Sequence, residues 1–229
     1  DDGRLYIAME FLAGESLAAR LAKVGRLPPR FAVKVALQVL RSLQEAHALG
    51  LVHRDLKPDN IFLCDIVGAS DFVKVIDFGV AKLSGRDEGQ ALTRTGVVIG
   101  TPHYMSPEQV QSNDVDGCAD LYALGVVLYE CLCGRIPFAR ESELAVCLAH
   151  LTDAPPAFRE AGGPADVVLE GVVMQAMAKR PASRFATAEA MTGALEAWLA
   201  VAPEARATAV VTPTGHALAP PGFADTTDE

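Results

Sequence analysis

Apolar residues recur at helical spacing through most of the chain, which predicts a mainly helical protein. The longest stripe lies over residues 31–49, with apolar positions at 33, 36, 37, 40 and 43. One face of a helix of about five turns would be buried, and Gly50 would end that helix. Further helical patterns lie over residues 16–24, 119–133, 141–151, 165–178 and 187–200.

Three short apolar segments instead predict β-strands. Residues 5–11 (LYIAMEF) are bulky and apolar, which predicts a buried strand. Residues 61–64 and 73–76 are separated by the polar segment 65–72, which contains glycine, as in a hairpin with a somewhat long loop. The fold class that follows is α+β, with a mainly helical lobe and a small β-element at one edge.

Two segments lack a sustained apolar period. Residues 77–100 are rich in Gly, Ser, Thr and charge and predict a long loop, and loops of that length in compact domains are usually functional. Ser106-Pro107-Glu108-Gln109 then gives a helix start signal, with Ser as the N-cap and Gln closing a capping box. Residues 201–229 are rich in Ala, Pro, Thr and acid, so we expect a domain over 1–200 and a disordered tail after it.

Composition narrows the class of protein. Hydrophobic residues make up 50% of the 229, and 29 acidic residues against 20 basic ones give a net charge of −9, which argues against a nucleic-acid partner. Five cysteines without a repeating spacing do not suggest a disulfide framework or a zinc site, so we expect free thiols in a reducing, cytoplasmic compartment. The longest apolar run, residues 121–133, is interrupted by Glu130 and is shorter than the ~20 residues that span a bilayer, so we expect no membrane segment in this chain.

The segment HRDLKPDN at residues 53–60 carries groups suited to phosphoryl transfer. Asp55 is a carboxylate that can orient a hydroxyl and accept its proton. Lys57, two residues on, would point to the same side of an extended loop and neutralise charge on the phosphate. Asn60 offers an amide oxygen for Mg²⁺, and Asp77, directly after a strand and before Phe78-Gly79, offers a carboxylate for the same ion.

These motifs resemble those of protein kinases. HRDLKPDN, then a hairpin and DFG, looks like the catalytic loop and the metal-binding loop of that family. Three later segments continue the resemblance: GTPHYMSPEQ at 100–109, DLYALGVVLYE at 120–130 and RPASRF at 180–185. The resemblance covers roughly residues 5–199 and is to bacterial serine/threonine kinases of the eukaryotic-like type, in particular their large C-terminal lobe.

The resemblance implies catalytic roles. Asp55 would be the base, Asn60 and Asp77 would bind Mg²⁺, and Lys57 with Thr101 would mark a Ser/Thr rather than a Tyr kinase.

It also implies structural roles. His53 and Phe78, followed by Gly79, would stack in a hydrophobic spine. Asp120 would hold the backbone of the catalytic loop from the central helix. Glu108 would form a buried ion pair with Arg184.

The same resemblance implies an ATP site. Residues 5–11 would be the last strand of the small lobe and the hinge, with Met9 guarding the back of the pocket. The backbone of Glu10 and Leu12 would meet the adenine, and Phe62 would form the apolar floor. The implied ligands are ATP and Mg²⁺, and the implied partners are protein substrates.

Regulation is implied as well. Arg54 precedes the catalytic Asp, and kinases with that arginine are typically switched by phosphorylation of the activation loop. Thr93 and Thr95 in LTRTG would be autophosphorylated, with dimerisation as one route to that reaction.

The sequence departs from the family before the hinge. It contains no Gly-rich phosphate loop, no strand Lys and no helix Glu to pair with that Lys, and it begins with Asp1. We therefore expect a fragment that is inactive alone. In the full-length protein, a membrane segment beyond the tail would serve as an anchor, as in many relatives. The alternative is a pseudokinase or scaffold that binds partners without catalysis. A small-molecule kinase is disfavoured, because the long threonine-bearing loop suits protein substrates.

Overall fold

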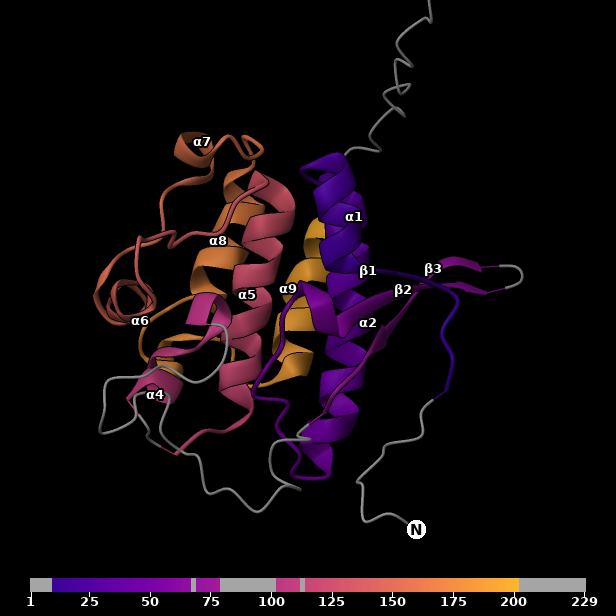
Figure 1. The fold of residues 1–229 in the computed structure, drawn as a ribbon, viewed down its shortest axis with the longest axis horizontal. Helices are drawn as coiled ribbons and strands as arrows, with labels where there is room; N and C mark the ends of the chain where they lie inside the picture. The colour runs from indigo at the N-terminus through magenta and orange to yellow at the C-terminus, as the bar shows by residue number, and fades with distance from the viewer. Residues whose placement is uncertain (1–9, 67–68, 79–101, 112–113, 202–229) are drawn as a thin grey trace, which may run out of the picture.

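Two helices that lie side by side, α2 (Pro29–Ala48) and α5 (Gly117–Cys133), form the centre of the molecule (Figure 1). The computed structural model describes residues 10–66, 69–78, 102–111 and 114–201. Almost every side chain of α5 is buried, which explains why its apolar pattern has no polar face.

The remaining helices pack around this pair. α8 (Val167–Ala176) contacts α5, and α9 (Ala188–Val201) contacts both α2 and α8. The other helices are α1 (Leu17–Val24), α4 (Pro107–Val110), α6 (Glu143–Thr152) and α7 (Phe158–Ala161), with 3-10 turns η1 (Pro58–Asn60), η2 (Pro102–Tyr104) and η3 (Pro181–Ser183).

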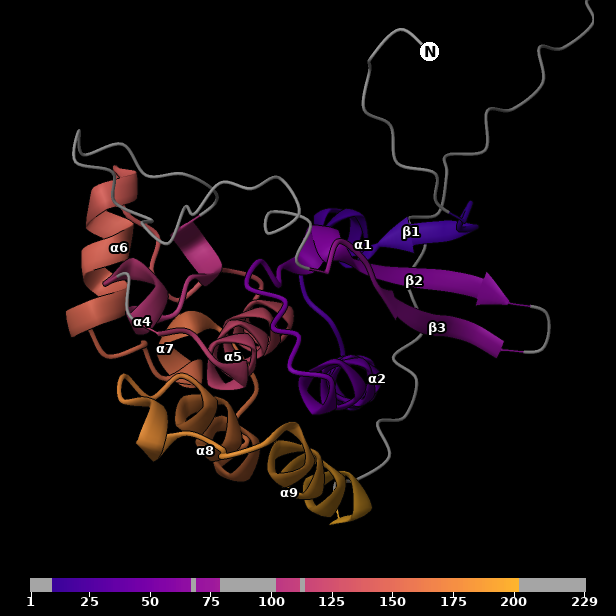
Figure 2. The same ribbon diagram turned by 90° about the horizontal axis from the view of Figure 1, so that it is seen from below.

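A three-stranded antiparallel sheet lies at one edge of the helical mass (Figure 2). Its strands are β1 (Gly14–Ser16), β2 (Ile61–Ile66) and β3 (Ala69–Val75), in that order across the sheet. Glu15 lies opposite Leu63, which lies opposite Val73. The sheet brings the end of β3 next to the start of β2, and the segments that carry the chemistry flank these ends.

The predicted α+β fold is confirmed, and the predicted helices appear within a few residues of their expected bounds. The capping box at Ser106 is also present: its hydroxyl accepts from the amide of Gln109, whose side chain accepts from the amide of Ser106. The short helix α7 and the three 3-10 turns were not predicted.

The strand predictions need correction. Residues 5–9 of the predicted strand 5–11 lie outside the described residues. Glu10 and Phe11 are not in a strand, and Phe11 is 92% exposed rather than buried. The hairpin loop is not long, because pairing continues to Ile66 opposite Ala69. The loop over 77–100 and the tail after residue 201 lie outside the described residues, apart from Asp77 and Phe78.

The five cysteines are free thiols, and four of them are buried. Burial raises the pKa of the Cys133 thiol to about 11 and also raises the pKa of Cys131, so both are inert at neutral pH. Among the described residues, none of the helices combines the length and apolar character that crossing a membrane requires.

Candidate active site

One buried carboxylate binds the backbone of the loop over residues 53–60. Asp120 on α5 is 1% exposed. Its Oδ1 accepts from the amide of Arg54 at 2.9 Å, and its Oδ2 accepts from the amide of His53 at 2.9 Å. Because a buried carboxylate needs donors, this pair of bonds fixes the backbone of the loop against the central helix.

Asp55 stands at the exposed tip of this loop. Its side chain is 55% exposed, and its Oδ2 accepts from the Lys57 ammonium at 2.7 Å. The Asn60 amide nitrogen donates to the backbone oxygen of Asp55 at 2.7 Å and more weakly to Oδ2 at 3.3 Å. The three side chains therefore converge on one point, and the Asp55 carboxylate stays accessible to a second molecule.

The loop is joined to the end of β3. The Ile76 amide donates to the backbone oxygen of Asn60 at 2.9 Å, and the His53 Nε2 lies 2.9 Å from the backbone oxygen of Ile76. The His53 and Phe78 rings meet edge to face, with centroids 4.7 Å apart. These contacts place Asp77 beside the loop over residues 53–60, although the two segments are far apart in sequence.

Two residues at this junction have left-handed backbone. Arg54 has φ 66° and Asp77 has φ 63°, a region that costs a residue with a Cβ about 1 kcal/mol or more. The surrounding hydrogen bonds, including one from the Gln109 side chain to the Arg54 oxygen at 2.6 Å, hold the loop in this conformation.

The donor set at this junction fits Mg²⁺. The amide nitrogen of Asn60 is engaged by Asp55, which leaves its oxygen as the atom for a cation. The Asp77 carboxylate is exposed. One amide oxygen and one carboxylate are hard ligands of the kind that Mg²⁺ takes, with water and phosphate completing its shell.

The expected hinge is only partly described. Glu10 is exposed and paired with Lys74 of β3, and Leu12 and Phe62 are partly buried. The remaining predicted site residues, Met9, Gly79, Thr93, Thr95 and Thr101, lie outside the described residues.

A buried ion pair joins two segments near the candidate active site. The Arg184 guanidinium donates to the two carboxylate oxygens of Glu108 at 2.7 and 2.8 Å, and both side chains are almost fully buried. Further bonds to the oxygens of Ala178, Cys118 and Lys179 use the remaining donors of Arg184. The bidentate geometry joins α4 to the segment before α9.

Comparison with known proteins decides the family. The family model described as "Protein kinase domain" matches residues 1–211. The chain belongs to the protein kinase domain family.

Named relatives agree with this family. The kinase domain is 43% identical over 200 residues to serine/threonine-protein kinase pkn3 of Myxococcus xanthus, covering 86% of this chain and 37% of that protein. It is 46% identical over 197 residues to Pkn1 of the same organism, covering 86% and 28%. PknB of Mycobacterium tuberculosis is 40% identical over 188 residues, covering 81% and 29%. The chain thus spans well under half the length of these curated relatives.

Solved structures give the same fold. The crystal structure of the Mycobacterium tuberculosis PknI kinase domain superposes with a TM-score of 0.65 at 28% sequence identity, covering 86% of this chain and 67% of that one.

The kinase domain also contains side-chain contacts that the sequence did not reveal. His47, at the end of α2, places its Nε2 2.8 Å from Asp120 Oδ2, so a third group converges on that carboxylate. The Tyr104 hydroxyl donates to Glu130 Oε2 at 2.7 Å, and burial raises the pKa of both side chains. Both contacts join residues more than 20 positions apart, which no local pattern indicates.

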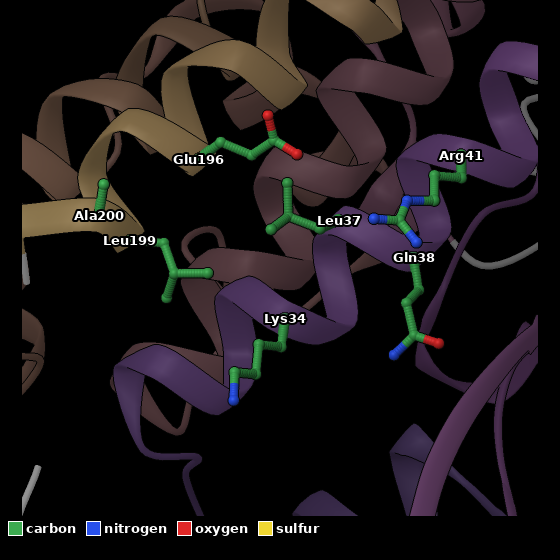
Figure 3. A pocket seen from close by; sticks show the side chains of 7 residues that line it. All are labelled: Lys34, Leu37, Gln38, Arg41, Glu196, Leu199 and Ala200. Carbon is green, nitrogen blue, oxygen red and sulfur yellow. The ribbon is translucent and has the colours of Figure 1, made fainter. Parts of the chain in front are cut away.

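A hollow of about 490 Å³ lies elsewhere in the kinase domain, between α2 and α9 (Figure 3). It is lined by Lys34, Leu37, Gln38, Arg41, Glu196, Leu199 and Ala200. None of residues 53–60 lines it, so it is separate from the candidate active site.

Proposed function

We propose that the whole protein containing this chain is a serine/threonine protein kinase, which transfers the γ-phosphate of ATP to Ser or Thr hydroxyls of protein substrates. The observation that carries the proposal is the exposed Asp55 carboxylate, held with Lys57 and Asn60 on a loop that Asp120 anchors. Kinase catalysis consists largely of positioning and charge stabilisation, and this loop supplies both.

In the proposed reaction, the substrate hydroxyl oxygen forms a bond to the γ-phosphorus while the bond from that phosphorus to the β–γ bridging oxygen breaks. Asp55 orients the hydroxyl and accepts its proton, and ADP carries away the electrons of the broken bond. Lys57, 2.7 Å from Asp55, lies where the ammonium can meet the negative charge of the transferred phosphate.

ATP and Mg²⁺ are the proposed ligands. Asn60 and Asp77 would hold the metal, which neutralises phosphate charge when bound. Met9, Glu10, Leu12 and Phe62 are the proposed adenine contacts, and the part of the cleft before the hinge would come from another part of the whole protein.

Phosphorylation of Thr93 and Thr95 is the proposed control. A phosphate on either residue would find the exposed guanidinium of Arg54, directly before the catalytic Asp55. An intact-mass measurement on the active whole protein should show phosphate on one or both threonines, and finding both unmodified would contradict the proposal.

The deciding experiment is the Asp55→Asn variant of the whole protein, assayed for phosphate transfer from labelled ATP to a protein substrate. Transfer should fall by about 10²–10⁴-fold, since the amide cannot accept the proton. Asp65→Asn, which changes an exposed carboxylate of β2 in the same way, is the matched control and should retain activity. Full activity in Asp55→Asn would contradict the role of Asp55 as the base, whereas a wild type that transfers no phosphate would favour the alternative of a scaffold.

A further inference from the structure

His150 is a fully buried histidine, far in sequence from the candidate active site, at the junction of three elements. Its side chain is 0% exposed near the end of α6. Its Nδ1 lies 2.8 Å from the hydroxyl of Tyr122 on α5, and its Nε2 lies 3.0 Å from the backbone oxygen of His103 in η2. Because a carbonyl oxygen only accepts, Nε2 carries the hydrogen and Nδ1 accepts from the tyrosine.

The surroundings of this ring keep it neutral. Phe138 meets it edge to face, with centroids 4.8 Å apart. The Lys179 ammonium lies 4.3 Å from the Phe138 ring and donates to the His150 backbone oxygen at 2.8 Å. Burial, with the positive charge of Lys179, lowers the pKa of His150 to about 3, so its pair of hydrogen bonds is constant across the working pH range.

Tyr122, which donates to His150, also contacts a residue that holds the far end of the segment beginning at η2. The Arg184 guanidinium lies 4.8 Å from the Tyr122 ring centroid and pairs with Glu108 in α4. Residues 102–108 are therefore fixed at the start by His150 and at the end by Arg184. Gln109, directly after them, donates to the Arg54 oxygen next to the catalytic Asp55.

We propose that His150 is a positioning residue for the protein substrate: by holding the His103 oxygen it sets where residues 102–106 lie beside the catalytic loop. The inference rests on the proposed kinase function and extends it. His150 touches neither the catalytic loop nor the expected nucleotide contacts. Its loss therefore raises the KM for the protein substrate and leaves the KM for ATP unchanged.

Two variants of the whole protein separate the two hydrogen bonds. The side-chain amide of His150→Asn reaches the Nδ1 position, where it meets Tyr122, but it is too short for the His103 oxygen. The longer amide of His150→Gln reaches the Nε2 position and can donate to that oxygen. Tyr129→Phe is the matched control, because it removes another buried hydroxyl of α5, one that donates to the Pro156 oxygen at 3.0 Å.

The expected result is a rise of about tenfold in the KM for a protein substrate in His150→Asn, with most of it restored in His150→Gln. Tyr129→Phe should match the wild type in both KM values, and so should the KM for ATP in every variant. An equal effect on both KM values, or no difference between His150→Asn and Tyr129→Phe, overturns the inference.

Amide hydrogen exchange over residues 102–106 tests the positioning without any assay of phosphate transfer. Exchange should be faster in His150→Asn than in the wild type and Tyr129→Phe, and equal rates overturn the inference. Failure of the proposed kinase function would give a different result, because the wild type itself would then show no phosphate transfer that depends on Asp55.

Discussion

His150 makes the stability of the kinase domain depend on pH. Its pKa is lowered from 6.5 to about 3 in the folded chain, so below pH 6.5 the unfolded chain binds a proton that the folded chain does not. The free energy of unfolding should therefore fall by roughly 1 kcal/mol for each pH unit between about pH 6 and pH 4. Urea unfolding of the chain should show a shallower dependence in His150→Gln, and identical slopes would contradict the assignment.

Substitution of Asp120 should also lower the free energy of unfolding. The groups around its carboxylate are His47 Nε2 and the amides of His53 and Arg54. An amide in its place has one acceptor oxygen, so Asp120→Asn leaves a buried donor unpaired and should lower the free energy of unfolding by about 2 kcal/mol.

The control for this variant lies four residues earlier. Asp116 caps the start of α5 by accepting from the Cys118 amide, and asparagine caps a helix about as well as aspartate. Urea unfolding of Asp116→Asn should therefore match the wild type. Equal losses in the two variants would show that the Asp120 contacts are not special.

Two glycines in neighbouring helices should respond in opposite directions to the same substitution. A Cβ at Gly125 in α5 would lie 2.9 Å from the Ala176 Cβ and 3.0 Å from the Met177 Cγ, whereas a Cβ at Gly171 in α8 meets nothing within 4 Å. Gly125→Ala should destabilise by about 1–3 kcal/mol through overpacking. Gly171→Ala should stabilise by up to about 1 kcal/mol through helix propensity. Thermal unfolding measures both, and a stabilised Gly125→Ala would disprove the close packing of α5 on α8.

The helices and strands differ in how well the sequence predicted them. Long periodic helices such as α2 and α5 were predicted well, because burial of one face or of all faces leaves a clear pattern. The three-residue strand β1 was missed, because Gly14 has φ 135° and sits against the Leu63 oxygen, and only that long-range pairing makes it a strand. The motif around Asp55 was recognisable, but the contacts of His47 and His150 depend on tertiary packing alone.

At the scale of the whole molecule, the edge that carries the sheet and the expected hinge leaves apolar surface uncovered. Phe11 is 92% exposed there, and Phe62 and Phe78 are only partly buried. We expect the chain alone to self-associate at high concentration through this face. Light scattering should show less association in Phe11→Glu. Leu49→Glu, which changes another exposed apolar residue at the end of α2, should leave association unchanged, and an equal effect of both would refute the assigned face.

The chain alone should also lack appreciable kinase activity, because its sequence holds no Gly-rich loop or strand Lys to grip the phosphates of ATP. A phosphate-transfer assay of the isolated chain checks this expectation. Detectable transfer that Asp55→Asn abolishes would overturn it.

The left-handed backbone of Arg54 and Asp77 has a consequence for how this protein evolves. Glycine enters that region without the steric penalty that a Cβ brings, so a population selected in the laboratory for heat resistance alone should accumulate glycine at residue 77. Such survivors would melt later and no longer transfer phosphate. At this turn, stability would therefore be gained only by giving up the carboxylate that the proposed reaction needs.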